Sequence, residues 1–243
     1  MVDLHSHILP MLDDGAGSFE ESITMLEIAD KWNIRHIVAS SHGNEMYPYR
    51  ISQYKEAFAR LQTEIRRRNL KVKIYTGMEI MLVGDVLDRL LSGEYITIND
   101  TNYVLAEVPF EVSSSHIITK VNRFMDEGYR VVLAHPERYE VIKRNPDRVQ
   151  EILATGCVLQ LNTGSIAGVF GRECQRTAIN LLDRGMAQLI ATDAHDTRRR
   201  SHNMRDTMEV LKSRYTSEQI HLWTSENPSR VIKGMELLAV DDI

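Results

Sequence analysis

Short apolar runs rich in β-branched residues alternate along the chain with longer stretches whose apolar residues recur every three or four positions. The short runs are typical of buried strands, and the longer stretches are typical of amphipathic helices. Strands are predicted at 2–7, 35–42, 72–80, 103–110, 130–136, 157–164 and 187–195. Helices are predicted at 18–33, 51–68, 84–92, 116–127, 146–154, 172–184, 203–214 and 217–223. The pattern therefore repeats a strand followed by a helix from one end of the chain to the other.

The ends of several predicted helices carry local signals. Ser18, followed three residues later by Glu21, predicts a capping box at the start of the first helix. Gly128, Gly156 and Gly185 each follow a helix and precede a strand, where a left-handed C-terminal residue is expected.

Repeated strand–helix alternation predicts parallel strands joined by right-handed crossovers. Seven such units favour an α/β fold with a closed or nearly closed barrel, and a doubly wound open sheet is the alternative. No glycine-rich dinucleotide or phosphate loop marks the first strand–helix turn. No linker or low-complexity tract divides the chain, and the turn at 92–94 looks like an insertion in the third unit. A single domain over residues 1–243 is therefore expected.

Composition narrows the class of protein. The net charge of -5 and pI near 6.0 argue against a nucleic-acid partner, and the run Arg198, Arg199, Arg200 is the one local exception. No apolar stretch approaches the roughly 20 residues that a membrane-spanning helix needs, and the start of the chain does not resemble a signal peptide. We therefore expect no membrane insertion and a cytoplasmic location. Cys157 and Cys174 are too few for a disulfide framework or a structural zinc site, and both are expected to be small buried or semi-buried residues.

The carboxyl ends of the predicted strands carry the chemistry. Six of the seven strands have His, Asp or Glu at this end, where α/β barrels gather their active sites. A further acid follows the first strand in the loop "LDDG". The set is His5, His7, Asp14, His42, Glu79, Glu107, His135, Asp193 and His195. Buried charged groups are costly unless they are paired or bound to metal, so this clustering indicates a site.

The composition of this set favours several metal ions. A lone zinc uses about three or four protein ligands, and nine candidates exceed that number. Imidazole and carboxylate donors without thiolate suit Mn, Fe or Zn and disfavour copper. Three divalent ions, carrying +6, against four carboxylates would leave a formal +2, which favours a dianionic substrate. The alternative is a buried polar network that only holds the barrel together. The other four histidines are expected at the surface or in hydrogen bonds: His36, His116, His202 and His221.

Several ordered motifs carry a resemblance to a known family. "DLHSH", "SSH", "GMEI", "LAEVPF", "AHPERY" and "ATDAH" resemble the motifs of the polymerase-and-histidinol-phosphatase (PHP) metallohydrolases over essentially the whole chain. "DDGAGSFEES", "HPERY" and "NPSRVI" look like the manganese-dependent tyrosine phosphatases of Gram-positive capsule and exopolysaccharide operons. The resemblance implies a distorted TIM-like (β/α)7 barrel and a centre of three divalent metal ions, Mn first, with Fe or Zn as alternatives. It also implies that the substrate is phosphotyrosine on a bacterial tyrosine kinase.

The resemblance also assigns roles to residues. It marks all nine residues of the set as metal ligands, with Glu79 bridging, and places Arg138 and Arg200 on the phosphate. Arg198 and Arg199 remain alternatives to Arg200. If the leaving group is protonated, His42 and Asp193 are the candidate acids.

Other mechanisms and functions can be weighed from the sequence. A cysteine-based tyrosine phosphatase needs an arginine six residues after the thiolate, but Thr163 and Asn180 occupy those positions, so that mechanism is excluded. A histidinol-phosphate phosphatase with a small deep pocket is the close alternative. A non-catalytic metal-binding module and a nuclease are the other two, and the acidic charge disfavours the nuclease.

Overall fold

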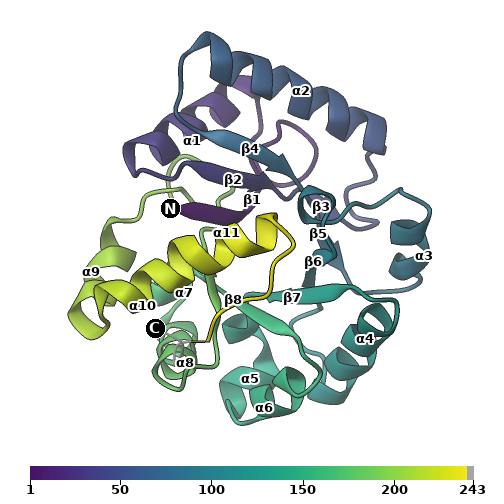
Figure 1. Ribbon diagram of the computed structural model, residues 1–243, viewed down its shortest axis with the longest axis vertical. Coiled ribbons are helices and arrows are strands. Elements are labelled where there is room, and N and C mark those ends of the chain that lie inside the picture. Colours follow the sequence, from purple (N-terminus) through teal and green to yellow (C-terminus); the bar gives the residue numbers. More distant parts are fainter. Residues whose placement is uncertain (240–243) are drawn as a thin grey trace.

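The computed structural model describes residues 1–239, whose strands are arranged around a barrel (Figure 1). Every strand pair is parallel. One sheet has the order β1-β2-β4, and the other has the order β3-β5-β6-β7-β8-β9. The strands are β1 (Val2–Ser6), β2 (His36–Ala39), β3 (His42–Gly43), β4 (Lys73–Thr76), β5 (Glu79–Met81), β6 (Tyr103–Glu107), β7 (Arg130–Ala134), β8 (Val158–Asn162) and β9 (Leu189–Ala191).

Two of the predicted strands are interrupted. The segment predicted at 35–42 forms β2 and β3, and the segment at 72–80 forms β4 and the start of β5, so the prediction of two continuous strands was wrong. The buried Tyr54 explains the break. Its hydroxyl donates to Ala39 O (2.8 Å) and accepts from Gly77 N (3.0 Å), and it thereby satisfies backbone groups where the strands separate. A Cβ at Gly77 would lie 2.5 Å from Val38, so only glycine fits this approach.

The two sheets join between the first and last strands. Ser6 and Ala194 form a parallel bridge, His7 N donates to Ala194 O (2.8 Å), and Asp193 N donates to His5 O (2.8 Å). These bonds connect β1 to the end of β9. The distorted (β/α)7 barrel is therefore confirmed, and the open doubly wound sheet is wrong.

Helices surround the barrel, and one of them covers an end. The α-helices are α1 (Phe19–Lys31), α2 (Ile51–Arg67), α3 (Val86–Leu91), α4 (Ser114–Asp126), α5 (Glu140–Arg144), α6 (Arg148–Leu153), α7 (Thr163–Ile166), α8 (Arg172–Asp183), α9 (Arg205–Arg214), α10 (Ser217–His221) and α11 (Asn227–Ile232). Two short 3₁₀-helices, η1 (Ile98–Asp100) and η2 (Pro136–Arg138), and one short π-helix, η3 (Leu222–Glu226), complete the set. The sequence pattern did not predict α5, α7 or α11, and residues 163–164, which were predicted as the end of a strand, begin α7. The equally short α3, α6 and α10 lie inside longer predicted segments. Among residues 1–239, no helix has the length and apolar character needed to cross a membrane.

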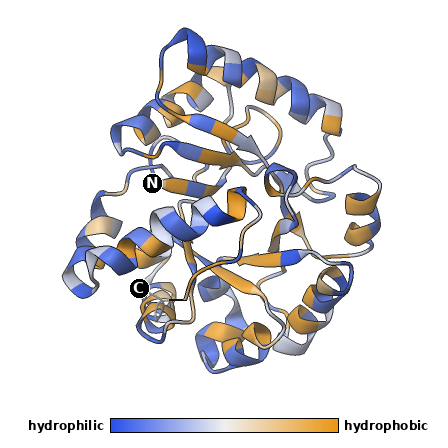
Figure 2. Cartoon of the chain, in the orientation of Figure 1, coloured by the Kyte–Doolittle hydropathy of each residue, from blue (hydrophilic) through white to orange (hydrophobic). Residues whose placement is uncertain are grey.

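The core has two parts. Val231 and Ile232 of α11 pack with Val2, Leu4 and Leu189, so α11 closes the barrel at the amino ends of its strands (Figure 1). A larger cluster fills the space between the strands and the outer helices. Figure 2 shows this division, with mostly apolar strands inside and long polar stretches on the outer helices. With one end covered, the carboxyl ends of the strands remain for the site.

The local signals at helix ends are only partly confirmed. Ser18 Oγ accepts from Glu21 N (3.1 Å), as a helix cap should. The Glu21 carboxylate, however, accepts from Gly17 N (3.0 Å) and not from Ser18 N, so the reciprocal half of the capping box is wrong. Gly128, Gly156 and Gly185 have φ values of 83, 86 and 63°, which confirms the left-handed C-terminal positions.

Candidate active site

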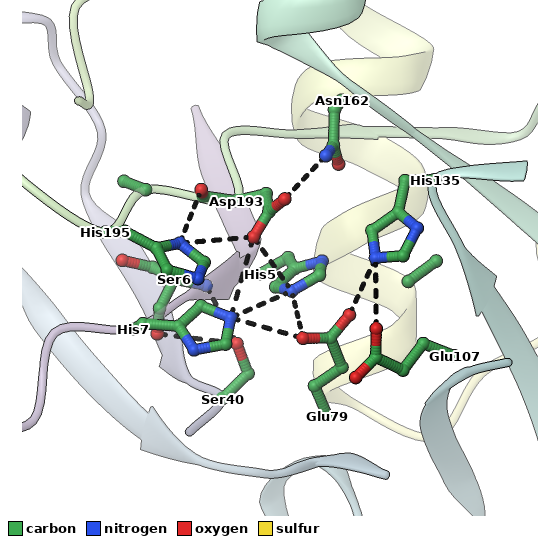
Figure 3. Close-up of polar contacts among 12 residues, drawn as sticks. His5, Ser6, His7, Ser40, Glu79, Glu107, His135, Asn162, Asp193 and His195 are labelled. Atoms are coloured by element: carbon green, nitrogen blue, oxygen red, sulfur yellow. Dashed lines mark hydrogen bonds and ion pairs between the residues drawn. The ribbon is translucent and has the colours of Figure 1, made fainter. Parts of the chain in front are cut away.

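The nine residues of the predicted set meet at the carboxyl ends of the strands. They come from β1, β3, β5 and β6, from the residues after β7 and β9, and from the loop after β1. Figure 3 shows seven of them converging: His5, His7, Glu79, Glu107, His135, Asp193 and His195. Their burial is nearly complete except at the solvent side, where the side chains of His42 and Asp14 are 13% and 43% exposed.

Four of these side chains form an inner group: His5, His7, Glu79 and Asp193. His5 Nε2 lies 3.2 Å from His7 Nε2 and 3.1 Å from Glu79 Oε2. Asp193 Oδ1 lies 3.3 Å from His5 Nε2 and 3.5 Å from His7 Nε2. Ligand atoms about 2.0–2.1 Å from a tetrahedral cation are separated by about 3.3 Å. The inner group therefore has the spacing of a coordination shell.

Two further groups adjoin the inner one. The outer group contains His7, Asp14, His42 and His195, and the acidic group contains His42, Glu79 and Glu107. Asp14 Oδ1 lies 3.3 Å from His42 Nε2 and 3.4 Å from His195 Nε2. Glu79 belongs to two of the three groups, as a bridging carboxylate would. His135 stands beside the acidic group, with its Nε2 2.9 Å from Glu79 Oε1 and 3.6 Å from Glu107 Oε2.

Three imidazoles are oriented in the same way. His5 Nδ1 donates to Gln160 Oε1 (2.8 Å), His7 Nδ1 donates to Asp13 Oδ2 (2.8 Å), and His195 Nδ1 donates to the carbonyl of Asp193 (3.0 Å). Each partner is an oxygen, so Nδ1 carries a proton and Nε2 faces the cluster, where it can coordinate a metal ion. This is the tautomer that metal-binding histidines adopt when an outer group orients the ring.

Several buried atoms of the cluster lack hydrogen bonds. Among residues 1–239, His42 Nδ1, Glu107 Oε1, Asp193 Oδ1 and His195 Nε2 have none. Buried polar atoms are normally satisfied, so each exception needs an explanation. A cation would satisfy all four, and the residues present therefore fit a metal centre.

The charges of the cluster favour cations. Burial alone would lower the pKa of His7, but Asp13 and Glu79 together raise it to about 9. Burial likewise opposes charge on His42, yet Glu79, Asp14 and Glu107 raise its pKa to about 12. The carboxylates thus impose a strongly negative potential on the positions where a metal ion would stand.

The sequence analysis missed three supporting residues. Asp13 orients His7 and also accepts from His42 N (2.8 Å). Gln160 and Asn162 lie on β8, which corresponds to the one predicted strand without His, Asp or Glu at its carboxyl end. Gln160 Nε2 donates to Asn162 Oδ1 (2.9 Å), and Asn162 Nδ2 donates to Asp193 Oδ2 (2.6 Å), as Figure 3 shows in part. The sequence signal that could have revealed Gln160 and Asn162 is the position of two amide side chains, two residues apart, in an otherwise apolar strand.

Two arginines stand above this network. Arg200 Nη2 donates to Asp193 Oδ2 at 2.7 Å, and Arg138 Nη1 donates to the same oxygen at 3.5 Å. The Arg138 guanidinium also lies 4.6 Å from the ring centre of Phe110 and 4.8 Å from that of Phe170. Both arginine side chains are partly exposed, at 22% and 24%, so each can reach a ligand that enters from solvent.

The barrel and the clustered imidazoles and carboxylates define the class of PHP-like metallohydrolases. The family model described as "Capsular polysaccharide synthesis, CpsB/CapC" matches residues 1–233, so the chain belongs to the CpsB/CapC family.

Named relatives cover the chain almost completely. The tyrosine-protein phosphatase YwqE of Bacillus subtilis is 30% identical over 98% of this chain and 93% of its own length. The tyrosine-protein phosphatase CpsB of Streptococcus pneumoniae is 29% identical over 96% and 98%. A solved structure from the work on YwqE and CpsB, described as metal-dependent tyrosine phosphatases, superposes with a TM-score of 0.90 at 29% identity, covering 98% of this chain and 97% of that one. A histidinol phosphate phosphatase from Lactococcus lactis, with a TM-score of 0.57 at 15% identity over 88% and 94%, shares the fold.

Proposed function

We propose that this chain is a metal-dependent protein-tyrosine phosphatase. The observation that carries the proposal is a pair of arginines beside three overlapping groups of imidazoles and carboxylates at the open end of the barrel. Both arginines donate to Asp193 Oδ2 of the inner group. Such a site suits a phosphate dianion. The full-length similarity to named tyrosine-protein phosphatases supports phosphotyrosine as the group that is hydrolysed.

The proposed metal ligands are the nine residues of the predicted set: His5, His7, Asp14, His42, Glu79, Glu107, His135, Asp193 and His195. Three ions, with Mn as the first choice and Fe or Zn as alternatives, correspond to the inner, outer and acidic groups. When bound, such ions lower the pKa of a water molecule and neutralise phosphate oxygens. Because residues from both halves of the chain contribute ligands, we also infer that the chain acts as one domain.

Arg138 and Arg200 are proposed to orient the phosphate. Both point at Asp193 Oδ2, so an entering dianion competes with that single oxygen for their donors. A guanidinium can hold two phosphate oxygens at once, which fixes the direction in which the phosphorus faces the cluster. Phe110 and Phe170 limit the movement of Arg138.

Of the two candidate acids, Asp193 is the poorer proton donor. Burial alone would raise its pKa, but the nearby positive charges of His5 and Arg200 lower it below the ordinary value for aspartic acid. The group therefore stays a carboxylate. His42 lies at the solvent side and keeps the role of candidate acid, although a phenolate is a good leaving group and needs little protonation.

The physiological substrate is proposed to be a phosphotyrosine protein of capsule or exopolysaccharide synthesis, with a bacterial tyrosine kinase as the first candidate. The family description supports the link to capsular polysaccharide.

The test is a side-by-side assay of the Mn-loaded chain on a phosphotyrosine peptide, the matched phosphoserine peptide and histidinol phosphate. We expect the phosphotyrosine peptide to have the highest kcat/KM. A preference for histidinol phosphate would replace the proposal with the alternative phosphatase. Absence of turnover on all three, with metal bound, would favour the non-catalytic metal-binding module. Asp193→Asn, which keeps the shape of the side chain, is the inactive control.

A further inference from the structure

Two arginines beside the site have no partner within the described chain. In residues 1–239, the guanidinium groups of Arg198 and Arg199 make no ion pair and no hydrogen bond, whereas the neighbouring Arg200 binds Asp193. Both side chains are exposed. Exposed charge runs are usually only solvated, so a binding role needs further support.

The first support is an ordered backbone. Asp196 Oδ1 accepts from the backbone N of Arg198 (2.6 Å) and of Arg199 (2.8 Å), and the carbonyl of Arg200 accepts from His195 N (2.7 Å) and Asp196 N (3.0 Å). These bonds close the loop on itself and anchor it next to His195. The two guanidinium groups are therefore displayed from a fixed turn, which reduces the entropy lost when they bind a ligand.

The second support is a groove. A cavity of about 260 Å³ is lined by the three arginines, by Phe170 and by polar groups that include Asn203. Phe170 also contacts Arg138, so the groove is lined by Arg200 and adjoins Arg138, the two arginines proposed to hold the phosphate. Asp206 is the one acid among its lining residues, and the groove is positive on balance.

Resting on the proposed function, we propose that Arg198 and Arg199 form a subsite for an acidic side chain of the phosphoprotein substrate. Two residues of chain span at most about 7 Å, so the Cα atoms of Arg198 and Arg199 lie within about 7 Å of the Cα atom of Arg200. The acidic residue therefore lies within about two or three positions of the phosphotyrosine in an extended substrate. The subsite would select peptides by charge and leave the chemistry at the metal cluster unchanged.

The test compares two phosphotyrosine peptides that differ only in having Glu or Gln at the three positions on either side of the tyrosine. The Mn-loaded full chain is assayed with both peptides and with p-nitrophenyl phosphate, as wild type and as Arg198→Gln/Arg199→Gln. The matched control is Arg66→Gln/Lys71→Gln, which removes the same charge at exposed positions near the amino end of β4, the opposite end of the barrel from the site.

For the Glu peptide, the double variant should lower kcat/KM by about three- to tenfold, mainly through KM, as expected for two exposed charge contacts. Rates on the Gln peptide and p-nitrophenyl phosphate should change by less than about twofold, the control variant should match wild type, and added salt should reduce the preference for Glu. Equal losses on all three substrates, or no loss on the Glu peptide, would overturn the subsite.

Binding of the two peptides as non-hydrolysable phosphonates, followed by fluorescence anisotropy, gives the same comparison without turnover. A charge preference in binding that disappears in the double variant supports the subsite even if the phosphatase proposal fails, and its absence overturns the subsite.

Discussion

The role of single residues is clearest at Arg138, which contacts Asp193 Oδ2 and two aromatic rings but is not itself a member of the three candidate metal groups. We expect Arg138→Ala to lower kcat/KM on a phosphotyrosine peptide by about one to two orders of magnitude, because charge-assisted hydrogen bonds contribute roughly 1.5–3 kcal/mol. Metal content should not change. Steady-state kinetics and metal analysis on the same sample measure both quantities.

Arg138→Lys is the matched variant, since lysine keeps the charge but cannot donate to two oxygens in parallel. If the contact strengthens in the transition state, Arg138→Lys should lower kcat and kcat/KM by a similar factor. Wild-type kcat/KM in the alanine variant, or a loss that follows metal content, would show that Arg138 does not bind the phosphate.

Phe170 is a single residue that is expected to position the guanidinium groups of Arg138 and Arg200. Its ring lies 4.8 Å from the Arg138 guanidinium and 5.9 Å from that of Arg200, and Gly164 packs against it so closely that a Cβ would lie 2.7 Å from the ring. Cation–π contacts contribute about 0.5–2 kcal/mol, so Phe170→Leu should raise KM about three- to tenfold, whereas Phe170→Tyr should restore it. Equal kinetic constants in the leucine variant and wild type would rule out this role.

The cysteines should be dispensable. Burial raises the pKa of Cys157 to about 12, and it also raises the pKa of Cys174. Both thiols are therefore neutral near pH 8, so native protein should react slowly with iodoacetamide and unfolded protein quickly. The Cys157→Ser/Cys174→Ser protein should keep its phosphatase activity, and a strong chelator should abolish it. Loss of turnover in this double variant with its metal still bound would contradict the proposed mechanism.

At the scale of elements, the interrupted strands show what the pattern of apolar residues leaves out. That pattern predicts each strand from its own residues, but the breaks after β2 and β4 depend on Tyr54, which comes from α2. A contact between distant segments leaves no periodic signal in either. The breaks matter because His42 and Glu79 begin the next strands, and their direction is set there.

Tyr54→Phe should therefore affect both stability and metal binding. Removing the hydroxyl leaves the buried Ala39 O and Gly77 N without their partner, at a cost of about 1–3 kcal/mol. Denaturant unfolding measures this loss, and a Mn titration should show weaker binding because β3 and β5 carry His42 and Glu79. Phe58→Tyr, a change of similar size next to Tyr54 on α2, is the control and should leave Mn binding unchanged.

The same reasoning explains which site residues the sequence could reveal. The nine clustered residues could be found because charged side chains at buried strand ends are rare without a partner. Gln160 and Asn162 could not, because neutral amides are ordinary in a strand until their neighbours are known. Asp13 could not be identified either, because Asp13 and Asp14 are adjacent in a loop, and the sequence of a loop does not predict which of the two carboxylates contacts His7.

For the whole molecule, the proposed centre joins segments from both halves of the sequence. The inner group takes two ligands from the end of β1, one from β5 and one from the end of β9, the same two ends that close the barrel. Metal that binds only the folded state adds its binding free energy to stability, so removing it should destabilise the entire barrel and not one loop.

We expect metal analysis of protein purified without chelator to approach three divalent ions per chain. Chelation should lower Tm in a single cooperative transition. Glu79→Gln, which removes the carboxylate shared by two groups, should reduce both the bound metal and the stabilisation by Mn, while Glu111→Gln in the loop after β6 should change neither. A ratio that stays at one ion under saturating Mn, or a Tm that does not respond to chelator, would contradict a centre of three ions that holds the barrel closed.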